Sequence, residues 1–411
     1  MLNDRQRHQR FKKMKQYSIT ICILFGCFLL TFCQHPSSGH HRSDYVLPEV
    51  KPAQYVQYKK QAVDLQDSDI VRKIHALDCY FEDKVRNHAF NGAVLISYKG
   101  TPIFERYYGF KDYGTKEKLT PFSSFQIAST TKTFTSGAIL QLVQQNLLSL
   151  DDTLQKFFPT FPYKKITVRM LLNHRSGLPS YLEFAELYWK NKKKFMSNQD
   201  VLDLMLKYKP KILNQPNTHF RYNNTNYVLL ALIVEQVSGM PFCDFMHQSI
   251  FVPLGMMDTW VYDPLSVRPS ATKGYKGSRW VEDAIVYTDG VTGDKGIYST
   301  VRDLYKWDQA LYAGKLIRPD LLGQAFTPQS FEKAGNKNYG LGWRVNDQAD
   351  GTRLIYHNGW WHSYNSVFNR RITDKTSVII LSSHYSSSVY KIQPVWDILY
   401  GDGVVAHSEF E

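Results

Sequence analysis

The apolar positions of the chain follow two different periods, and the period changes along the sequence. Between residues 70 and 86, apolar side chains recur every three or four positions, as on one face of a helix. They are Ile70, Ile74, Leu77 and Phe81. Residues 92–98 and 101–109 are rich in β-branched and aromatic residues and flank Lys99-Gly100, which predicts a β-hairpin. A helix is therefore expected to precede a pair of strands.

The middle and the end of the chain predict different kinds of element. Helical periodicity dominates residues 168–172, 198–208 and 227–238, which loops containing glycine and proline separate. The last quarter combines helices with strand-like runs. The helices are expected at residues 301–312 and 389–399, and the strands at residues 339–345, 353–359, 363–371 and 376–383.

Strands at both ends of the chain, with helices between them, predict one sheet assembled from both ends. Consecutive strands near the C-terminal end favour antiparallel pairing. We therefore expect an α+β fold that forms one domain. Its α/β sheet region would comprise residues 65–120 and 285–411, and its helical region residues 121–284.

The first 33 residues have the pattern of a targeting segment. Basic residues precede an apolar run at residues 19–32, which is short for a membrane-spanning helix. They are Arg5, Arg7, Arg10, Lys12, Lys13 and Lys15. Leu30 lies three residues before Cys33, as in bacterial lipoprotein processing sites, so Cys33 is the expected lipid anchor and a retained leader is the alternative. We expect export to the bacterial cell envelope, with residues 34–64 as a flexible linker from a membrane to a folded part that faces the periplasm or the exterior.

Composition narrows the class of protein further. A chain of 411 residues with 43% hydrophobic residues can bury a large core. The net charge of +13 belongs in part to the targeting segment and includes no arginine-rich block, so we expect no nucleic-acid partner. Cys79 and Cys243 lie far apart in sequence and are interpreted as two buried thiols rather than a disulfide. The pattern does not indicate an oligomeric state.

Candidate chemistry begins with FQIASTTKTFT at residues 125–135. A serine followed three residues later by a lysine in a helix places both side chains on one face, so the amine of Lys132 can reach the hydroxyl of Ser129 and share its proton. Spacing alone does not select this pair, because the same spacing recurs elsewhere. The other pairs are Ser270/Lys273, Ser330/Lys333 and Ser388/Lys391.

Two further segments carry groups that acyl transfer needs. In FRYNNTNY, Tyr222 can relay a proton, and Asn224, two residues later, can hydrogen-bond an acyl amide. In YHNGWW, His357, Asn358 and Gly359 end a predicted strand, and the glycine would let a substrate approach the backbone closely. Each residue also has a structural explanation, as a half-buried aromatic, a helix-terminal polar residue or a strand histidine.

The order of these motifs resembles that of the penicillin-recognising serine hydrolases, which include class C β-lactamases, D-alanyl-D-alanine peptidases and related esterases. The motifs are Ser129-Thr130-Thr131-Lys132, Tyr222-Asn223-Asn224 and His357-Asn358-Gly359. Flanking stretches such as ITVRMLLNHRSGLPSY and IFVPLGMMDT are similar to the family too, and the likeness runs from about residue 70 to the C-terminus. The other Ser-x-x-Lys pairs lack this context, so Ser129 is the candidate nucleophile.

The resemblance implies an antiparallel sheet flanked by helices, an all-helical region, and an active site in the cleft between them. Ser129 would attack a carbonyl to form an acyl-enzyme, with Lys132 and Tyr222 sharing proton transfer. The backbone N–H groups of Ser129 and Trp360 would form the oxyanion hole. Water would then release the acyl group.

The resemblance also locates substrate-binding groups and a departure from the β-lactamases. Asn224 would orient the acyl side chain, and His357 would occupy the position often held by a lysine. The third motif reads His-Asn-Gly instead of Lys-Thr-Gly. The cation and the hydroxyl that bind a substrate carboxylate are thus replaced by groups that favour an anion less strongly. Trp360 and Trp361 add two large rings beside the oxyanion strand.

Other polar residues receive structural roles. His174 is interpreted as a structural histidine in a turn away from the chemistry. Asp294 and Lys295, in GDKG, are expected to shape a loop that faces the cleft, where Lys295 can touch a substrate. The chain has no His-Glu-x-x-His zinc motif and no phosphate-binding loop, so we expect neither a metal nor a cofactor.

Together these patterns favour an envelope-associated serine hydrolase. It would act through an acyl-serine on an ester, an amide, a D-amino-acid peptide or a β-lactam, with a small-molecule or peptide acyl substrate as its partner. One alternative is a non-catalytic penicillin-binding-like sensor or cell-wall-binding protein. Another is a membrane-tethered interaction module in which the serine and the lysine only cap a helix.

Overall fold

The structure is a computed structural model that describes residues 63–314, 316–332, 335 and 337–401. The predicted targeting segment, its candidate lipid anchor Cys33 and residues 34–62 of the predicted linker lie outside the described residues. All described residues belong to one structural unit of the chain.

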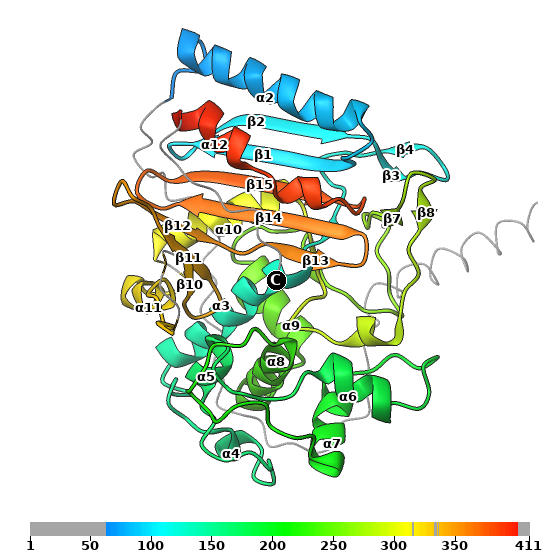
Figure 1. Ribbon diagram of the computed structural model, residues 1–411, viewed down its shortest axis with the longest axis vertical. Coiled ribbons are helices and arrows are strands. Elements are labelled where there is room, and N and C mark those ends of the chain that lie inside the picture. Colours follow the sequence, from blue (N-terminus) through cyan, green and yellow to red (C-terminus); the bar gives the residue numbers. More distant parts are fainter. Residues whose placement is uncertain (1–62, 315, 333–334, 336, 402–411) are drawn as a thin grey trace, which may run out of the picture. The chain divides into compact units, whose positions relative to one another are not determined.

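An antiparallel sheet with strands from both ends of this unit forms the centre of the fold (Figure 1). Its order is β10-β11-β12-β14-β15-β1-β2, and β13 also pairs with β14. Strand β1 forms the predicted hairpin with β2 on one side and pairs with β15 on the other. The strands are β1 (Gly92–Tyr98), β2 (Thr101–Tyr108), β10 (Lys337–Tyr339), β11 (Arg344–Asp347), β12 (Arg353–Tyr356), β13 (Gly359–Trp361), β14 (Tyr364–Arg371) and β15 (Thr376–Ser382). The expected α+β class is confirmed.

Successive residues of the central strands face two different cores, because side chains alternate across a strand. In β1, Ala93 and Leu95 belong to the larger core, and Val94 and Ile96 belong to the smaller one. Both faces of the sheet are therefore covered. This explains why these strands read as continuous apolar runs rather than as alternating apolar and polar positions.

Three helices cover the two faces of the sheet (Figure 1). They are α2 (Ser68–Arg86), α10 (Val301–Ala313) and α12 (Gln393–Tyr400). Helices α2 and α12 bury Phe81 and Trp396 in the smaller core, and α10 buries Trp307 in the larger core. Helix α2 starts where the Asp67 carboxylate accepts backbone N–H groups of the first turn, so its N-terminus is capped.

A helical region connects the two parts of the chain that form the sheet. Its elements are η1 (Ala128–Thr130), α3 (Thr131–Gln144), α4 (Leu154–Phe157), α5 (Val168–Leu172), α6 (Tyr181–Tyr188), α7 (Asn198–Tyr208), α8 (Asn224–Ser238), α9 (Phe242–Met246) and η2 (His247–Phe251). Most residues of α3 and α8 are buried, so these two helices form the centre of the larger core. Helix α8 begins three residues earlier than expected, because the Asn223 side chain accepts the N–H of Thr225 and caps it.

Short elements complete the described fold. The helical ones are η3 (Tyr287–Gly290), α11 (Pro319–Ala325) and η4 (Ser387–Tyr390). The short strands pair as β3 (Phe110–Asp112) with β4 (Glu117–Lys118), β5 (Phe125–Gln126) and β6 (Trp260–Val261) with β9 (Ile297–Ser299), and β7 (Tyr275–Lys276) with β8 (Val281–Glu282). Strand β9 leads directly into α10.

Two predicted strands are each broken in the structure. The run at residues 339–345 contains the end of β10, a loop and the start of β11. The loop includes Gly342, whose φ of 87° and contact with the Ser136 side chain only a glycine can accommodate. The run at residues 353–359 contains β12 and the start of β13, both of which pair with β14, and the chain leaves the ladder between them at His357 and Asn358.

The two cysteines of the described chain differ from expectation in their burial. Cys79 and Cys243 are both exposed free thiols rather than buried ones. Cys79 lies on the solvent side of α2, and Cys243 lies in the short helix α9.

No single described helix is both long enough and apolar enough to span a membrane. One pair of helices meets both conditions by length and composition alone, Asn224–Ser238 with Phe242–Phe251, and it is bent by 80°.

Candidate active site

The candidate nucleophile lies where a short strand turns into a buried helix. The chain runs from β5 through η1 into α3, and from Ser123 to Leu142 every residue is buried except Ser129, which is partly exposed. Ala128, directly before it, has a φ of 47°, in the left-handed region that is costly for a residue with a Cβ atom. The tight turn thus presents one hydroxyl from an otherwise buried segment.

Lys132 lies one helical turn after Ser129, on the same face of α3. Its Nζ atom is 3.0 Å from Ser129 Oγ and donates a hydrogen bond of 2.7 Å to the backbone carbonyl of Asp294. The lysine is buried, so its amine is held between the hydroxyl and the carbonyl. The competing pair at Ser270 has a different environment, because Lys273 forms ion pairs with Asp112 and Glu282.

Tyr222 approaches the same lysine from the other side. It precedes α8, and its ring centroid lies 5.0 Å from Lys132 Nζ. The ring also packs 4.4 Å from the ring of His174 and 6.2 Å from that of His357. The fold therefore brings the serine–lysine pair, the tyrosine and the third motif together from three distant segments.

His174 lies closer to the site than the sequence analysis expected. It is fully buried, and Nδ1 accepts the backbone N–H of Asn223 at 3.1 Å, next to Tyr222. Burial, together with the positive charge of Lys132, lowers the pKa of His174 well below its usual value. It is a neutral residue that supports Tyr222, and the interpretation that it sits away from the chemistry is wrong. His174 follows the C-cap of α5 with a φ of 58°, a conformation that the sequence motif did not reveal.

His357 is held in one tautomer by two hydrogen bonds. Nδ1 lies 2.8 Å from the Asn358 carbonyl, which can only accept, so Nδ1 carries the proton. Nε2 then accepts from the Tyr339 hydroxyl at 3.0 Å. Burial first, and then the nearby charges of Arg344 and Lys132, lower the pKa of His357 well below its usual value. The position that often holds a lysine is therefore uncharged near neutral pH.

Strand β13 lies directly against the nucleophile turn. A Cβ atom added to Gly359 would come within 2.3 Å of the Ile127 carbonyl oxygen and 2.9 Å of Ser129 N, so only glycine fits here. Thr130 Oγ1 donates to the His357 carbonyl at 2.9 Å and also lies 2.8 Å from Ser366 Oγ on β14. These contacts fix the backbone of the third motif beside Ser129.

The remaining predicted binding residues have separate environments. The buried Oδ1 atom of Asn224, the first residue of α8, has no hydrogen-bond partner among the described residues, which is unusual unless a ligand supplies one. The Asn358 side chain instead accepts a hydrogen bond from Asn369 at 3.1 Å. Trp360 is half exposed, and its ring lies 5.5 Å from that of Tyr385.

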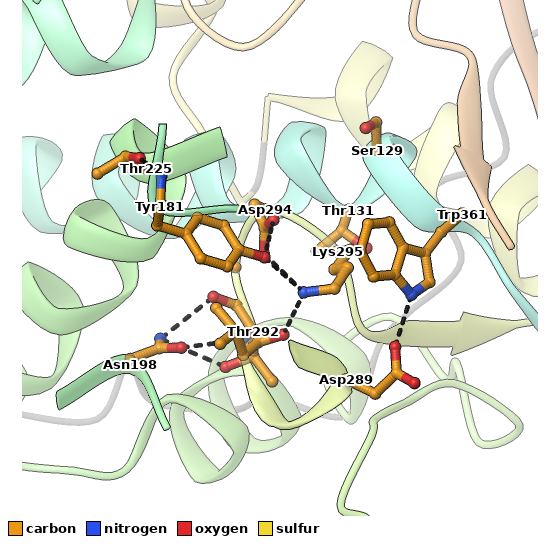
Figure 2. A network of polar contacts seen from close by, with 12 residues as sticks. Ser129, Thr131, Tyr181, Asn198, Thr225, Asp289, Thr292, Asp294, Lys295 and Trp361 are labelled. Carbon is orange, nitrogen blue, oxygen red and sulfur yellow. Dashed lines mark hydrogen bonds and ion pairs between the residues drawn. The ribbon is translucent and has the colours of Figure 1, made fainter. Parts of the chain in front are cut away.

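The loop at residues 293–296 carries a buried network that the sequence did not reveal (Figure 2). The Tyr181 hydroxyl lies between Asp294 Oδ2, at 3.0 Å, and Lys295 Nζ, at 2.8 Å. Trp361 packs 4.7 Å from the same ammonium and donates from Nε1 to Asp289 at 2.6 Å. Lys295 is only 3% exposed, so the expectation that it faces a cleft where it can touch a substrate is wrong.

Candidate metal ligands are not grouped in the described part of the chain. Within residues 63–401, gaps aside, no group of three or more His, Cys, Asp and Glu side chains is placed to hold a metal ion. The polar groups around Ser129 are donors and acceptors of protons instead.

Comparison with known proteins places these features in a family. Residues 77–394 match the sequence model of the family described as Beta-lactamase. Penicillin-binding protein 4* of Bacillus subtilis (strain 168) is 32% identical over 344 residues, which cover 79% of this chain and 76% of that protein. A D-aminopeptidase of Brucella anthropi is 27% identical over 270 residues, which cover 65% of this chain and 51% of that protein.

A solved structure extends the comparison to the fold. The D-amino acid amidase from Ochrobactrum anthropi SV3, complexed with L-phenylalanine amide, superposes with a TM-score of 0.66 at 25% identity, over 81% of this chain and 99% of that one. The chain belongs to the β-lactamase family of serine hydrolases.

Proposed function

We propose that this protein is an envelope-associated hydrolase that cleaves an ester, an amide or a D-amino-acid peptide through an acyl-serine at Ser129. The observation that carries the proposal is the 3.0 Å separation of Lys132 Nζ and Ser129 Oγ, with the Tyr222 ring 5.0 Å from the same nitrogen. A hydroxyl hydrogen-bonded to an amine, with a phenol ring beside that amine, provides a nucleophile and a route for its proton.

The proposed reaction has two steps. Ser129 Oγ attacks the substrate carbonyl and passes its proton to Lys132 or Tyr222, which returns a proton to the departing alcohol or amine. Water then attacks the acyl-serine, and its proton restores the hydroxyl. The backbone N–H groups of Ser129 and Trp360 would stabilise the oxyanion, a role that the close approach of β13 to the nucleophile turn supports.

The substrate class follows from the third motif and from Asn224. A neutral His357 removes the positive charge that a lysine supplies at this position, which favours substrates with an uncharged group there over those with a carboxylate. The unpartnered Oδ1 of Asn224 can accept an N–H from an acyl amide. The names of the similar proteins, D-aminopeptidase and D-amino acid amidase, support an amide or a D-amino-acid derivative.

The proposed location rests on the sequence of the first 33 residues. A basic segment, an apolar run and Cys33 support export and lipid attachment at the envelope. If this is correct, the full chain fractionates with membranes and its Cys33→Ser variant does not. Equal membrane association of the two chains would contradict lipidation at Cys33.

The activity is tested by labelling and by substrate profiling. A fluorophosphonate should transfer its phosphonyl group to Ser129 with release of fluoride, which mass spectrometry detects. Turnover of p-nitrophenyl esters or D-alanyl amides, assayed side by side with nitrocefin, should exceed that of the β-lactam. Ser129→Ala should abolish both labelling and turnover. Ser270→Ala, from another Ser-x-x-Lys pair, is the matched control and should retain both.

The opposite outcome is equally specific. Turnover that survives in Ser129→Ala would exclude this serine as the nucleophile. Acylation that is never followed by release of the acyl group would instead favour a binding or sensing protein.

A further inference from the structure

A second buried ammonium lies beside the candidate active site, and the proposed reaction does not use it. Lys295 is almost inaccessible to solvent, because the residue is only 3% exposed. It donates to the Tyr181 hydroxyl at 2.8 Å and to the Val291 carbonyl at 3.1 Å, and it lies 3.6 Å from Asp294 Oδ1. Burying a charged amine costs free energy unless neighbouring groups stabilise the charge. The neighbours of Lys295 therefore indicate what the charge does.

Asp294 connects this ammonium to Lys132. Its backbone carbonyl accepts the 2.7 Å hydrogen bond from Lys132 Nζ, and its carboxylate Oδ2 accepts from Tyr181 at 3.0 Å. The other carboxylate oxygen is buried and has no hydrogen-bond partner among the described residues, so its charge is balanced mainly by Lys295. One residue therefore holds Lys132 through its backbone carbonyl. Its side chain is connected to Lys295 through the Tyr181 hydroxyl (Figure 2).

The loop that carries Asp294 is hydrogen-bonded to helix α3 both before and after this residue. Thr135 Oγ1 donates to the Gly293 carbonyl at 2.7 Å, and the N–H of Ile297 donates to Thr131 Oγ1 at 3.2 Å. Gly293 has a φ of 94°, and a Cβ atom there would come within 2.6 Å of the Tyr227 carbonyl oxygen on α8. The position of the loop relative to Lys132 is thus closely determined.

We propose that Lys295 is a positioning residue for the reaction at Ser129, which acts through Asp294 and Tyr181 to hold Lys132 in place. The proposal rests on the function proposed above. Lys295 itself does not contact the substrate.

The electrostatic part of the proposal concerns a defined set of charges. The titratable and charged groups around the two lysines are Asp289, Asp294, Tyr181, Tyr222, Tyr227, His174, His357, His362 and Arg344. Burial and the charge of Lys132 both lower the pKa of Lys295, and Asp294 and Asp289 oppose this. The repulsion between the two ammonium groups is mutual, so a change of charge at Lys295 also changes the electrostatic potential at Lys132.

Two substitutions that change the charge in opposite directions test the proposal. The readout is the rate at which a fluorophosphonate labels Ser129 as a function of pH, which requires no known substrate. Lys295→Met removes a positive charge, so the acid limb of the profile should move up by about one pH unit and labelling at pH 7 should slow about tenfold. Asp294→Asn keeps the carbonyl that holds Lys132 but removes a negative charge, so the acid limb should move down.

Three further variants separate charge from packing. Lys295→Arg keeps the charge and should keep the acid limb of the wild-type protein. Tyr181→Phe keeps all charges and the direct ion pair but removes the hydroxyl that bridges Asp294 and Lys295, so it should slow labelling without moving the limb. Lys156→Met removes a lysine that is 53% exposed on α4 and should change neither the rate nor the profile.

The outcomes distinguish this proposal from the proposed function. Acid limbs that do not move, or that move in the same direction in Lys295→Met and Asp294→Asn, would overturn the role of Lys295 while leaving Ser129 as the nucleophile. If Lys295→Met does not fold, Lys295→Gln replaces it, because glutamine also removes the charge; its acid limb should move up while that of Lys295→Arg stays in place, and equal limbs in the two variants would overturn the role of Lys295. A wild-type protein that is not labelled at Ser129 would instead overturn the proposed function.

Discussion

At the scale of single residues, the site depends on which polar groups are charged and which are neutral. Lys132 is held by a carbonyl and a hydroxyl, whereas two histidines near it are buried and neutral. His174 supports Tyr222 through ring packing, and His357 is fixed by Tyr339. The proposed reaction therefore assigns proton transfer to Lys132 and Tyr222.

Tyr222→Phe tests the role of the phenol. Its ring packs against His174, and phenylalanine keeps that ring, so thermal unfolding should change little. Loss of the hydroxyl should slow acylation of Ser129 by about 10²- to 10⁴-fold, the usual contribution of general acid–base catalysis. Labelling kinetics and a melting curve measure the two effects; unaltered labelling would show that Tyr222 has no part in the proton transfer.

The two neutral histidines should make stability depend on pH. Burial holds the pKa of His174 and of His357 well below the value of about 6.5 expected in the unfolded chain. Below that pH the unfolded state binds more protons than the folded state, so the free energy of unfolding should fall by about 1.4 kcal/mol per pH unit for each histidine. Urea unfolding between pH 7 and pH 5 measures the slope.

Substitution should reduce this slope in a site-specific way. His174→Gln combined with His357→Gln should flatten it, whereas His219→Gln, at an exposed histidine, should leave it unchanged. An equal slope in all three proteins would assign the pH dependence to other groups.

At the scale of elements, the site is a contact between a strand and a turn. Strand β13 is three residues long and lies against η1, and neither element could place a substrate carbonyl alone. Gly359 makes the contact possible, because a side chain would overlap the Ile127 carbonyl oxygen. Thr130 joins the turn to the carbonyl of His357.

Gly359→Ala tests this contact. The added methyl group would force β13 away from the turn, so we expect a loss of about 1–3 kcal/mol in the free energy of unfolding, as in other overpacked cores. We also expect Ser129 labelling to slow at least tenfold, since the oxyanion donors would separate. Chemical unfolding and labelling kinetics measure the two effects.

Gly323→Ala is the matched control for this substitution. Gly323 is an exposed residue within α11, and its added methyl group meets no atom within 4 Å. Alanine is the better helix former, so stability should rise by up to about 1 kcal/mol and labelling should be unchanged. Similar losses in the two variants would mean that the close approach of β13 to the turn is not required.

At the scale of the whole described unit, the sheet joins segments from both ends of the chain. Residues Gly92 and Ser382 face each other across β1 and β15. Helix α10 is attached to one face of this sheet by a fully buried ion pair, in which Arg370 Nε donates to Asp308 Oδ1 at 2.5 Å. Helix α10 in turn stacks Trp307 on Phe134 of α3, with ring centroids 4.6 Å apart, and so connects the sheet to the helix that follows Ser129.

The buried ion pair should be much more sensitive to loss of one partner than of both. Asp308→Leu leaves the Arg370 guanidinium buried without its counter-charge, so the free energy of unfolding should fall by about 3–5 kcal/mol. Adding Arg370→Met should recover much of the loss. Asp320→Leu, which breaks the exposed Arg318–Asp320 pair, is the control and should have no measurable effect on urea unfolding. A similar small effect for both pairs would contradict a structural role for the buried one.

Local pattern predicted most of the elements because it depends on neighbours in the chain. The hairpin of β1 and β2, the helices α2, α5, α7 and α10, and the strands β14 and β15 lie at or within a few residues of the predicted positions. The break before β11 was missed because it depends on Gly342, which packs against Ser136 of α3. The break before β13 was missed because it lies at His357 and Asn358, where the His357 carbonyl accepts from Thr130 of η1.

The sequence by itself determined the α+β class, the family and the order of the three motifs, since periodicity and motif spacing are carried by the chain regardless of how it packs. Only the tertiary structure decided that His357 is neutral, that His174 backs Tyr222 and that Lys295 is buried beside Asp294 rather than open to a substrate. The physical reason is that burial and charge depend on groups contributed by distant segments. Lys132 and the carbonyl that holds it are 162 residues apart in the chain and 2.7 Å apart in space.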